Sequence, residues 1–265
     1  MQPSKRIVLV LAALLLCLSG CTQNKSGKFE AAVKLFAAGD YAQAAEAFEK
    51  LGDYATAPTY AAYSHGLVLY DQGQYGAAEP YFAQTRDFMY GEERYQYCHA
   101  VALMEAGSFA EAAACFEGMG EFENAVQQAQ YCAARHAEDS RDYENALYAY
   151  EAAGQTQDAP DRLLNLQGQL YNRAIAMKAE GDYANAITLF TMLGDYLSAA
   201  EQAIQCKEVG LERQYSDAEA LEAQGDLQGA FNLFLALSGY RDAADRAQAL
   251  SVQLGIEIKP GDDLY

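Results

Sequence analysis

Histidines and cysteines are the residues of this 265-residue chain best suited to metal binding or nucleophilic chemistry. His65 and His99 lie 34 positions apart, and two histidines on neighbouring helices could share a metal ion. No Cys-x-x-Cys, His-x-x-x-His or Glu-x-x-His spacing accompanies them, so we expect ordinary hydrogen-bonded histidines and no metal site. The sequence also lacks the Gly-x-Ser-x-Gly and Gly-x-x-x-x-Gly-Lys-[Ser/Thr] signatures. We therefore expect a protein that is not an enzyme and uses no cofactor.

Cys21 is the residue with the clearest expected chemistry. Two basic residues precede an apolar run from Ile7 to Leu18, which is typical of a secretory signal peptide and too short to favour a transmembrane helix. The run ends in Leu18-Ser19-Gly20-Cys21, which resembles the lipobox of bacterial lipoproteins. That resemblance implies cleavage before Cys21 and acylation of this cysteine, with palmitate among its chains. The alternative is an ordinary signal peptide with an incidental cysteine, or a buried N-terminal helix.

These features predict where the protein resides. We expect a signal peptide over residues 1–20, a flexible tether over 21–28, and a lipid anchor on the extracytoplasmic side of a bacterial cell membrane. Without Lys5 and Arg6 the mature part would carry 16 basic residues (18 − 2) against 37 acidic ones, a net charge of −21. Such an acidic body is repelled by phosphate backbones, which excludes nucleic acid as a partner. We expect contact with the membrane through the lipid alone.

The rest of the chain is built from a repeated frame that would position any functional residue. An aromatic or leucine is followed three residues later by alanine and four residues after that by an aromatic. The frames are Tyr41-Ala44-Phe48, Tyr75-Ala78-Phe82, Phe109-Ala112-Phe116, Tyr143-Ala146-Tyr150, Tyr183-Ala186-Phe190 and Leu227-Ala230-Phe234. The first four are 34 residues apart, which predicts one supersecondary unit stacked on the next. Cys98 and Cys132 are repeat equivalents, and we expect them to be small packing residues rather than a disulfide.

Each unit is predicted to contain two helices, because apolar residues recur at helical spacing and prolines are few. A Gly-x-aromatic turn such as Gly39-Asp40-Tyr41 would end the first helix, and the residue after the glycine would cap the second. The fourth unit has Arg141 in place of the glycine. The last two spacings grow to 40 and 44 residues, which predicts first helices longer by about two and three turns.

The register of small and aromatic residues over 29–251 resembles that of the tetratricopeptide repeat family. That resemblance implies an all-α solenoid of about six antiparallel helix pairs, whose first helices line a concave groove that binds protein or peptide. The family's proline near the end of each unit is missing here, and a Leu-Gly-Asp-Tyr turn such as Leu51-Gly52-Asp53-Tyr54 stands there instead. Residues 252–265 break the pattern and are expected to form a mobile tail.

A file of first-helix residues is the candidate partner site. Its aromatics, one in each unit, are Phe29, Tyr63, Tyr97, Tyr131, Tyr171 and Tyr215. The predicted groove is formed by Tyr63, Tyr97, Tyr131, Leu67, Val101, Tyr70 and Met104. It would hold a protein segment, or a glycan or cell-envelope polymer stacked on the tyrosine rings. The alternative, which aromatic stripes at helical spacing favour, is that these rings wedge adjacent units together.

Overall fold

The computed structural model describes residues 24–258, which form helices and turns and include no strand. The all-α prediction is therefore confirmed for this part of the chain. The predicted signal peptide and Cys21 lie outside the described residues. Within residues 24–258, no helix has both the length and the apolar character needed to cross a bilayer. The chain divides into two compact units, one ending at Pro160 and one beginning at Asp161, and each is described by itself.

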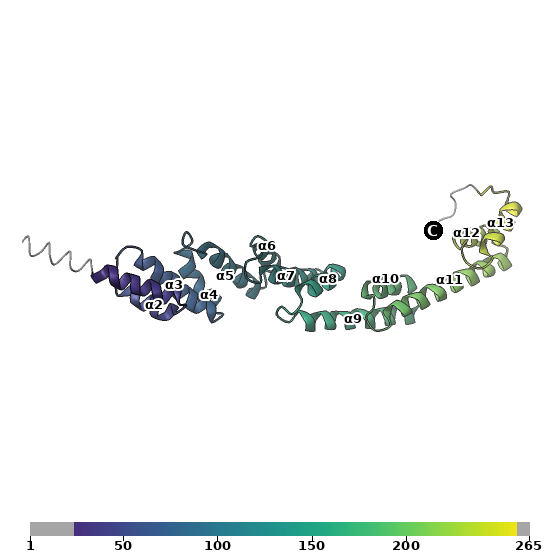
Figure 1. Cartoon of the computed structure of the whole chain (residues 1–265). Coiled ribbons are helices and arrows are strands. Elements are labelled where there is room, and N and C mark those ends of the chain that lie inside the picture. The colour runs from purple at the N-terminus through teal and green to yellow at the C-terminus, as the bar shows by residue number, and fades with distance from the viewer. Residues whose placement is uncertain (1–23, 259–265) are drawn as a thin grey trace, which may run out of the picture. The chain divides into compact units, whose positions relative to one another are not determined.

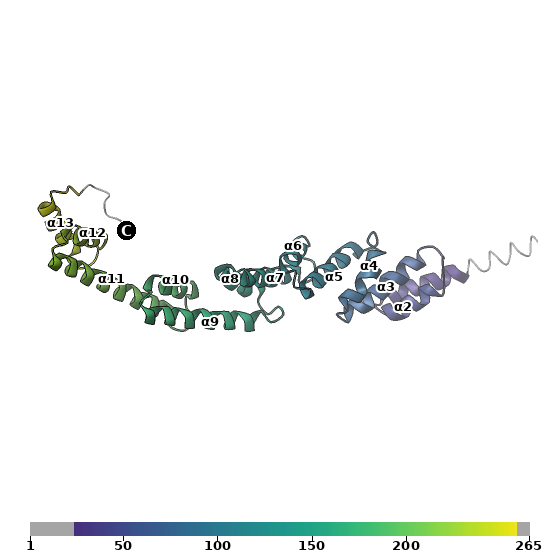
Figure 2. The ribbon, with the colours of Figure 1, turned by 180° about the vertical axis from the view of Figure 1, so that it is seen from behind.

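Helices of two kinds alternate along the chain, and consecutive helices pack against each other in both units (Figures 1 and 2). A helix over 24–37 comes first. The second helices of the repeats are α2 (Tyr41–Glu49), α4 (Tyr75–Ala83), α6 (Phe109–Glu117), α8 (Tyr143–Ala153), α10 (Tyr183–Leu193) and α12 (Leu227–Ala236). The first helices of the following repeats are α3 (Ala57–Asp71), α5 (Gly91–Glu105), α7 (Ala125–Asp139), α9 (Ala159–Glu180), α11 (Ala199–Gln224) and α13 (Ala243–Leu254). This alternation is consistent with a helical-repeat solenoid.

The irregular spacing of the later repeats is absorbed by their first helices. α3, α5 and α7 have 15 residues each, whereas α9 has 22 and α11 has 26. The differences of 7 and 11 residues correspond to about two and three turns, as the sequence predicts. At the N-terminus the prediction is wrong, because residues 24–28, expected in a flexible tether, belong to the first helix. Lys25 and Lys28 are good helix formers, and the segment has no proline, so the helix tolerates Gly27.

The turn between the two helices of a repeat uses the left-handed backbone conformation. Gly39, Gly73, Gly107, Gly181 and Gly225 have φ between 71° and 85°. In the fourth repeat Arg141 takes the same place with φ 61°. A side chain with a Cβ is strained in this region, which explains why glycine occupies the other five positions.

A second turn, which joins one repeat to the next, also has a left-handed residue, and here it is never glycine. It lies two residues before each first helix, with φ of 50° or 51°. The six residues are Ala55, Met89, Glu123, Gln157, Leu197 and Arg241. Six unrelated side chains adopt one backbone geometry, so the turn is imposed by the packing of the helices on either side of it.

The core lies between the paired helices and follows the predicted register. The frame alanines Ala44, Ala78 and Ala112 and the frame aromatics Phe48, Phe82 and Phe116 are fully buried. Gly66 shows why the first helix needs a small residue here, because a Cβ at this position would lie 2.9 Å from the Phe82 ring. At the other end of the chain, α13 continues to Leu254, beyond the expected boundary at 251. Ile256 and Ile258 pack against the last core cluster, and residues 259–265 of the predicted tail lie outside the described part.

Candidate functional site

The aromatics of the first-helix file pack edge-on against other rings at two fixed sequence separations. The first is the frame aromatic 19 residues later, with ring centroids 5.5 to 6.4 Å apart in all six repeats. The second is an aromatic of the following turn 25 residues later, at 5.2 to 6.2 Å in five repeats. The fourth repeat has Thr156 at that turn position. These edge-to-face pairs hold the two helices and the turn of a repeat together.

The hydroxyls of four of these tyrosines connect each repeat to the next. Each bonds the side chain 27 residues later, which immediately precedes the next first helix. Tyr97 donates to Asn124 at 2.6 Å, Tyr131 donates to Asp158 at 2.7 Å, Tyr171 lies 2.8 Å from the Ser198 hydroxyl, and Tyr215 donates to Asp242. We call this contact the tyrosine latch. Burial raises the pKa of Tyr97 to about 12, which keeps the donating proton in place at neutral pH.

The predicted groove residues are therefore found between repeats. Tyr63, Tyr97, Tyr131, Leu67, Val101 and Tyr70 are buried, and Met104 is half-buried. The sequence left two roles open for these tyrosines, lining a groove or packing between adjacent units. In the structure they pack between units, because neighbouring helices cover their rings. Their rings are covered, and of these tyrosines Tyr131 alone also borders one of the clefts described below. The signal that could have shown this was in the sequence, since Asn124, Asp158, Ser198 and Asp242 each follow a file tyrosine by 27 positions.

Two of the predicted residues lie at the edge of an open cleft of about 420 Å³. Met104 and Tyr131 line it together with Phe109, Arg135 and Gln157. The Arg135 guanidinium lies 4.2 Å from the centroid of the Phe109 ring, and its Nη1 donates to the Tyr131 hydroxyl at 3.1 Å. Arg135 thus bonds the hydroxyl that forms the latch of Tyr131, and its guanidinium already has two interaction partners.

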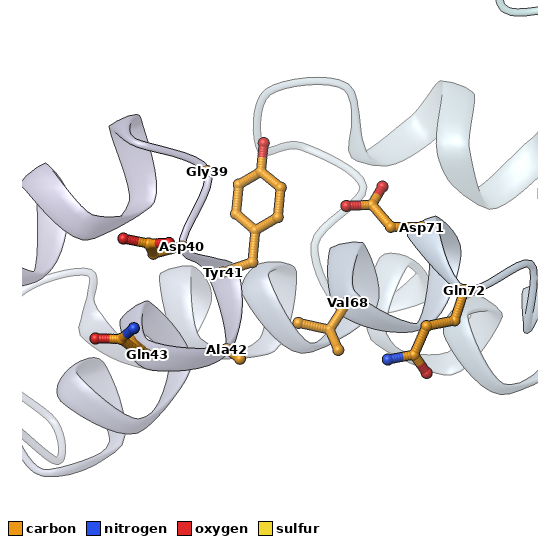
Figure 3. Close-up of a pocket in the computed structure, with 8 residues that line it drawn as sticks. All are labelled: Gly39, Asp40, Tyr41, Ala42, Gln43, Val68, Asp71 and Gln72. Carbon is orange, nitrogen blue, oxygen red and sulfur yellow. The ribbon is translucent and has the colours of Figure 1, made fainter.

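A second cleft, of about 310 Å³, opens between the turn of the first repeat and α3 (Figure 3). In this view the ring of Tyr41 stands between the carboxylates of Asp40 and Asp71, and the Asp71 side chain points toward the ring. Val68 lies below the ring, and Gln43 and Gln72 add amide groups. We call this the Tyr41 cleft. Its lining includes two carboxylates and no basic residue, so it attracts positive charge.

The free state of Asp40 distinguishes it from the three other aspartates at the equivalent position. Asp142, Asp182 and Asp226 occupy the same position and accept hydrogen bonds from backbone N–H groups of Asn145, Asn185 and Gly229. The side chains of Asn145 and Asn185 donate to the same carboxylates at 2.7 Å. Asp40 makes no such capping bond, and Gln43 stands where the others have asparagine or glycine. The expected side-chain cap is therefore absent at α2, as it is at α4 and α6, and the carboxylate of Asp40 is left for the cleft.

Two of the histidines have local partners, and three cysteines are buried. His65 lies 2.8 Å from Glu49 Oε1, and His99 lies 3.2 Å from Glu79 Oε1. Across residues 24–258, no three metal-binding side chains come together. Cys98, Cys132 and Cys206 are buried free thiols, and Cys115 is half-buried. Comparison of the chain with protein-family models and with curated proteins finds no match.

Proposed function

We propose that this protein is a lipid-anchored, tetratricopeptide-like scaffold that holds a protein partner at the outer face of a bacterial membrane. Support for the anchor comes from the lipobox-like sequence before Cys21. Support for binding comes from repeats that fill the described chain and from the open Tyr41 cleft. The observation that carries the proposal is the pair of free carboxylates, Asp40 and Asp71, on either side of one tyrosine ring.

Helix electrostatics single out one of these carboxylates. Asp71 is the last residue of α3, and the equivalent last residues of α5 and α7 are Glu105 and Asp139. A negative charge at a helix C-terminus opposes the helix dipole and costs about 0.3–1 kcal/mol. A positive group bound at Asp71 would remove this cost.

The partner that fits this chemistry presents lysine or arginine side chains. A guanidinium or ammonium group can bond the carboxylates and lie over the Tyr41 face. The chain has a formal net charge of −19, which draws a basic partner from a distance. A glycan receptor would need open ring faces, and the rings of Tyr63, Tyr97 and Tyr131 are covered. The geometry therefore favours the protein partner over the glycan.

Site-specific cross-linking in living cells tests this proposal. A photo-reactive residue at Gln72, in the cleft, should capture a discrete protein partner. The same residue at Gln155, an exposed turn position of the same unit, serves as the matched control and should not. Replacing Asp71 with asparagine should abolish capture while raising the free energy of unfolding by about 0.3–1 kcal/mol, because the opposing charge is removed.

Loss of capture in such a variant cannot be attributed to unfolding. Capture that is equal from Gln72 and Gln155, or unchanged in the Asp71→Asn variant, would refute the role of the cleft.

A further inference from the structure

The junction before α5 differs from the other five repeat junctions, each of which has a polar residue immediately before the first helix. The residue immediately before each first helix is polar in five cases: Thr56, Asn124, Asp158, Ser198 and Asp242. Before α5 it is Tyr90, whose side chain is 61% exposed, and the preceding Met89 is 52% exposed. Two large side chains therefore stand in solvent where the other repeats have a polar residue.

This departure removes a tyrosine latch. Tyr63 belongs to the file, and the residue 27 positions later is Tyr90. The Tyr63 hydroxyl instead accepts from Nη1 of Arg94 at 3.3 Å. An asparagine at position 90 would supply the oxygen that Asn124 supplies to Tyr97. The repeat has given up this hydrogen bond, and stability alone does not explain the choice.

Arg94 lies beside the exposed pair. Its guanidinium carbon is 5.9 Å from the centroid of the Tyr90 ring and 5.4 Å from that of Tyr70. Its Nε is buried without a hydrogen-bond partner. Tyrosine, methionine and arginine are the residue types enriched in protein–protein interfaces, and tyrosine and arginine recur among their hot spots.

Acidic residues outnumber basic ones around this turn. Asp87 and Glu93 flank them in sequence, and Glu123 holds the equivalent turn position of the next repeat. Burial, and next the charge of Glu123, raise the pKa of Tyr70, the ring over which Arg94 also lies. An apolar pair within an acidic rim is complementary to an apolar residue flanked by basic ones.

We infer that Met89, Tyr90 and Arg94 form a docking surface for a basic, amphipathic segment of a protein partner. The inference rests on the proposed scaffold function and adds a surface separate from the Tyr41 cleft. The partner's apolar side chains would cover Met89 and the Tyr90 ring. Its lysines or arginines would meet Asp87, Glu93 and Glu123.

A binding assay with a defined probe tests this surface. The probe is a labelled amphipathic helix of leucine and lysine, with its leucines on one face, and the matched control peptide has serine in place of leucine. Tyr90→Asn should weaken binding of the leucine peptide about tenfold, as expected for the loss of an interface tyrosine. The same variant should unfold at an equal or higher temperature, because the asparagine supplies the latch to Tyr63. The control variant is Tyr148→Asn, which changes a 73% exposed tyrosine of the same unit and should alter the affinity less than twofold.

Three results would overturn the inference. They are equal affinity of the wild-type protein and Tyr90→Asn for the leucine peptide, an equal loss in Tyr148→Asn, and equally tight binding of the serine peptide. None of them depends on capture at Gln72. A failure of this surface is therefore distinguishable from a failure of the scaffold proposal.

Discussion

The hydroxyl of Tyr97, on α5, donates a 2.6 Å hydrogen bond to Oδ1 of Asn124, the residue that precedes α7. This bond joins consecutive repeats and recurs with other partners along the chain. We expect Tyr97→Phe to lower the free energy of unfolding by about 0.5–1.5 kcal/mol, because it removes the hydrogen bond and keeps the ring packing. Denaturant unfolding measures the change, and Tyr148→Phe, at an exposed ring, should be neutral. A neutral Tyr97→Phe would show that the latch adds no stability.

Alkaline pH should release the latches. The pKa of Tyr97 is raised to about 12 from an ordinary value near 10, chiefly by burial. The folded state thus favours the protonated ring, so its contribution to stability is complete below pH 10 and is lost as the pH rises from 10 to 12. Circular dichroism combined with tyrosinate absorbance should show helix loss in this window. Titration of every tyrosine near pH 10, with the helices intact, would contradict the prediction.

Arg141 and Gly107 occupy equivalent turn positions with φ of 61° and 81°. Left-handed strain costs a residue with a Cβ about 1–2 kcal/mol, and the greater unfolded freedom of glycine offsets about 0.5–1 kcal/mol of this. Arg141→Gly should therefore raise the free energy of unfolding by about 0.5–1 kcal/mol, and Gly107→Arg should lower it by a similar amount. Thermal unfolding of the two reciprocal variants checks both signs, and a change of the same sign in both would refute the strain argument.

The four thiols of the repeat region should differ in reactivity. Burial raises the pKa of Cys98 and of Cys132 to about 12, and Cys206 is buried as well. Because the thiolate is the reactive form, we expect only the half-buried Cys115 to react readily with a disulfide reagent in the folded protein. A protein with Cys17 and Cys21 replaced by serine isolates these four thiols. Rapid reaction of all four before unfolding would contradict the burial.

Cys21→Ser should move the protein from the membrane to the soluble fraction, because each buried CH₂ of an acyl chain contributes about 0.8 kcal/mol to anchoring. Labelled palmitate should be incorporated by the wild-type protein and not by the variant. The conservative exchange of sulfur for oxygen leaves the rest of the signal sequence intact. Retention of an unlabelled variant at the membrane would argue against a lipid anchor at this residue.

Local pattern was sufficient to predict much of the fold. The frame beginning at Tyr41 places the second helices, and the longer spacings place the extra turns in α9 and α11. These features follow from backbone preferences and helical periodicity, which are encoded within a few residues. The environment of Tyr97 could not be predicted in this way. Periodicity shows which face of the helix it occupies, but whether that face is open or covered depends on how the next repeat packs.

The side-chain caps of the second helices also depend on more than the residue at the cap position. Asp182 and Asp40 each follow the turn glycine of their own repeat, yet only Asp182 caps its helix. The difference lies three residues later, where Asn185 supports the cap and Gln43 does not. Asp71 was also missed as a candidate, because its partner across the Tyr41 cleft comes from the preceding repeat. The recurrence of acidic residues at the ends of α3, α5 and α7 was the available signal.

The turn residues Ala55, Met89, Glu123, Gln157, Leu197 and Arg241 have nearly identical φ and almost nothing else in common. The neighbouring helices determine the backbone conformation of these residues, so the side chain can vary without changing the turn. Evolution could replace methionine with arginine at such a turn position. The surface would then bind a different partner while the helices beneath it stay the same. New specificity would then be accessible by single substitutions, one repeat at a time.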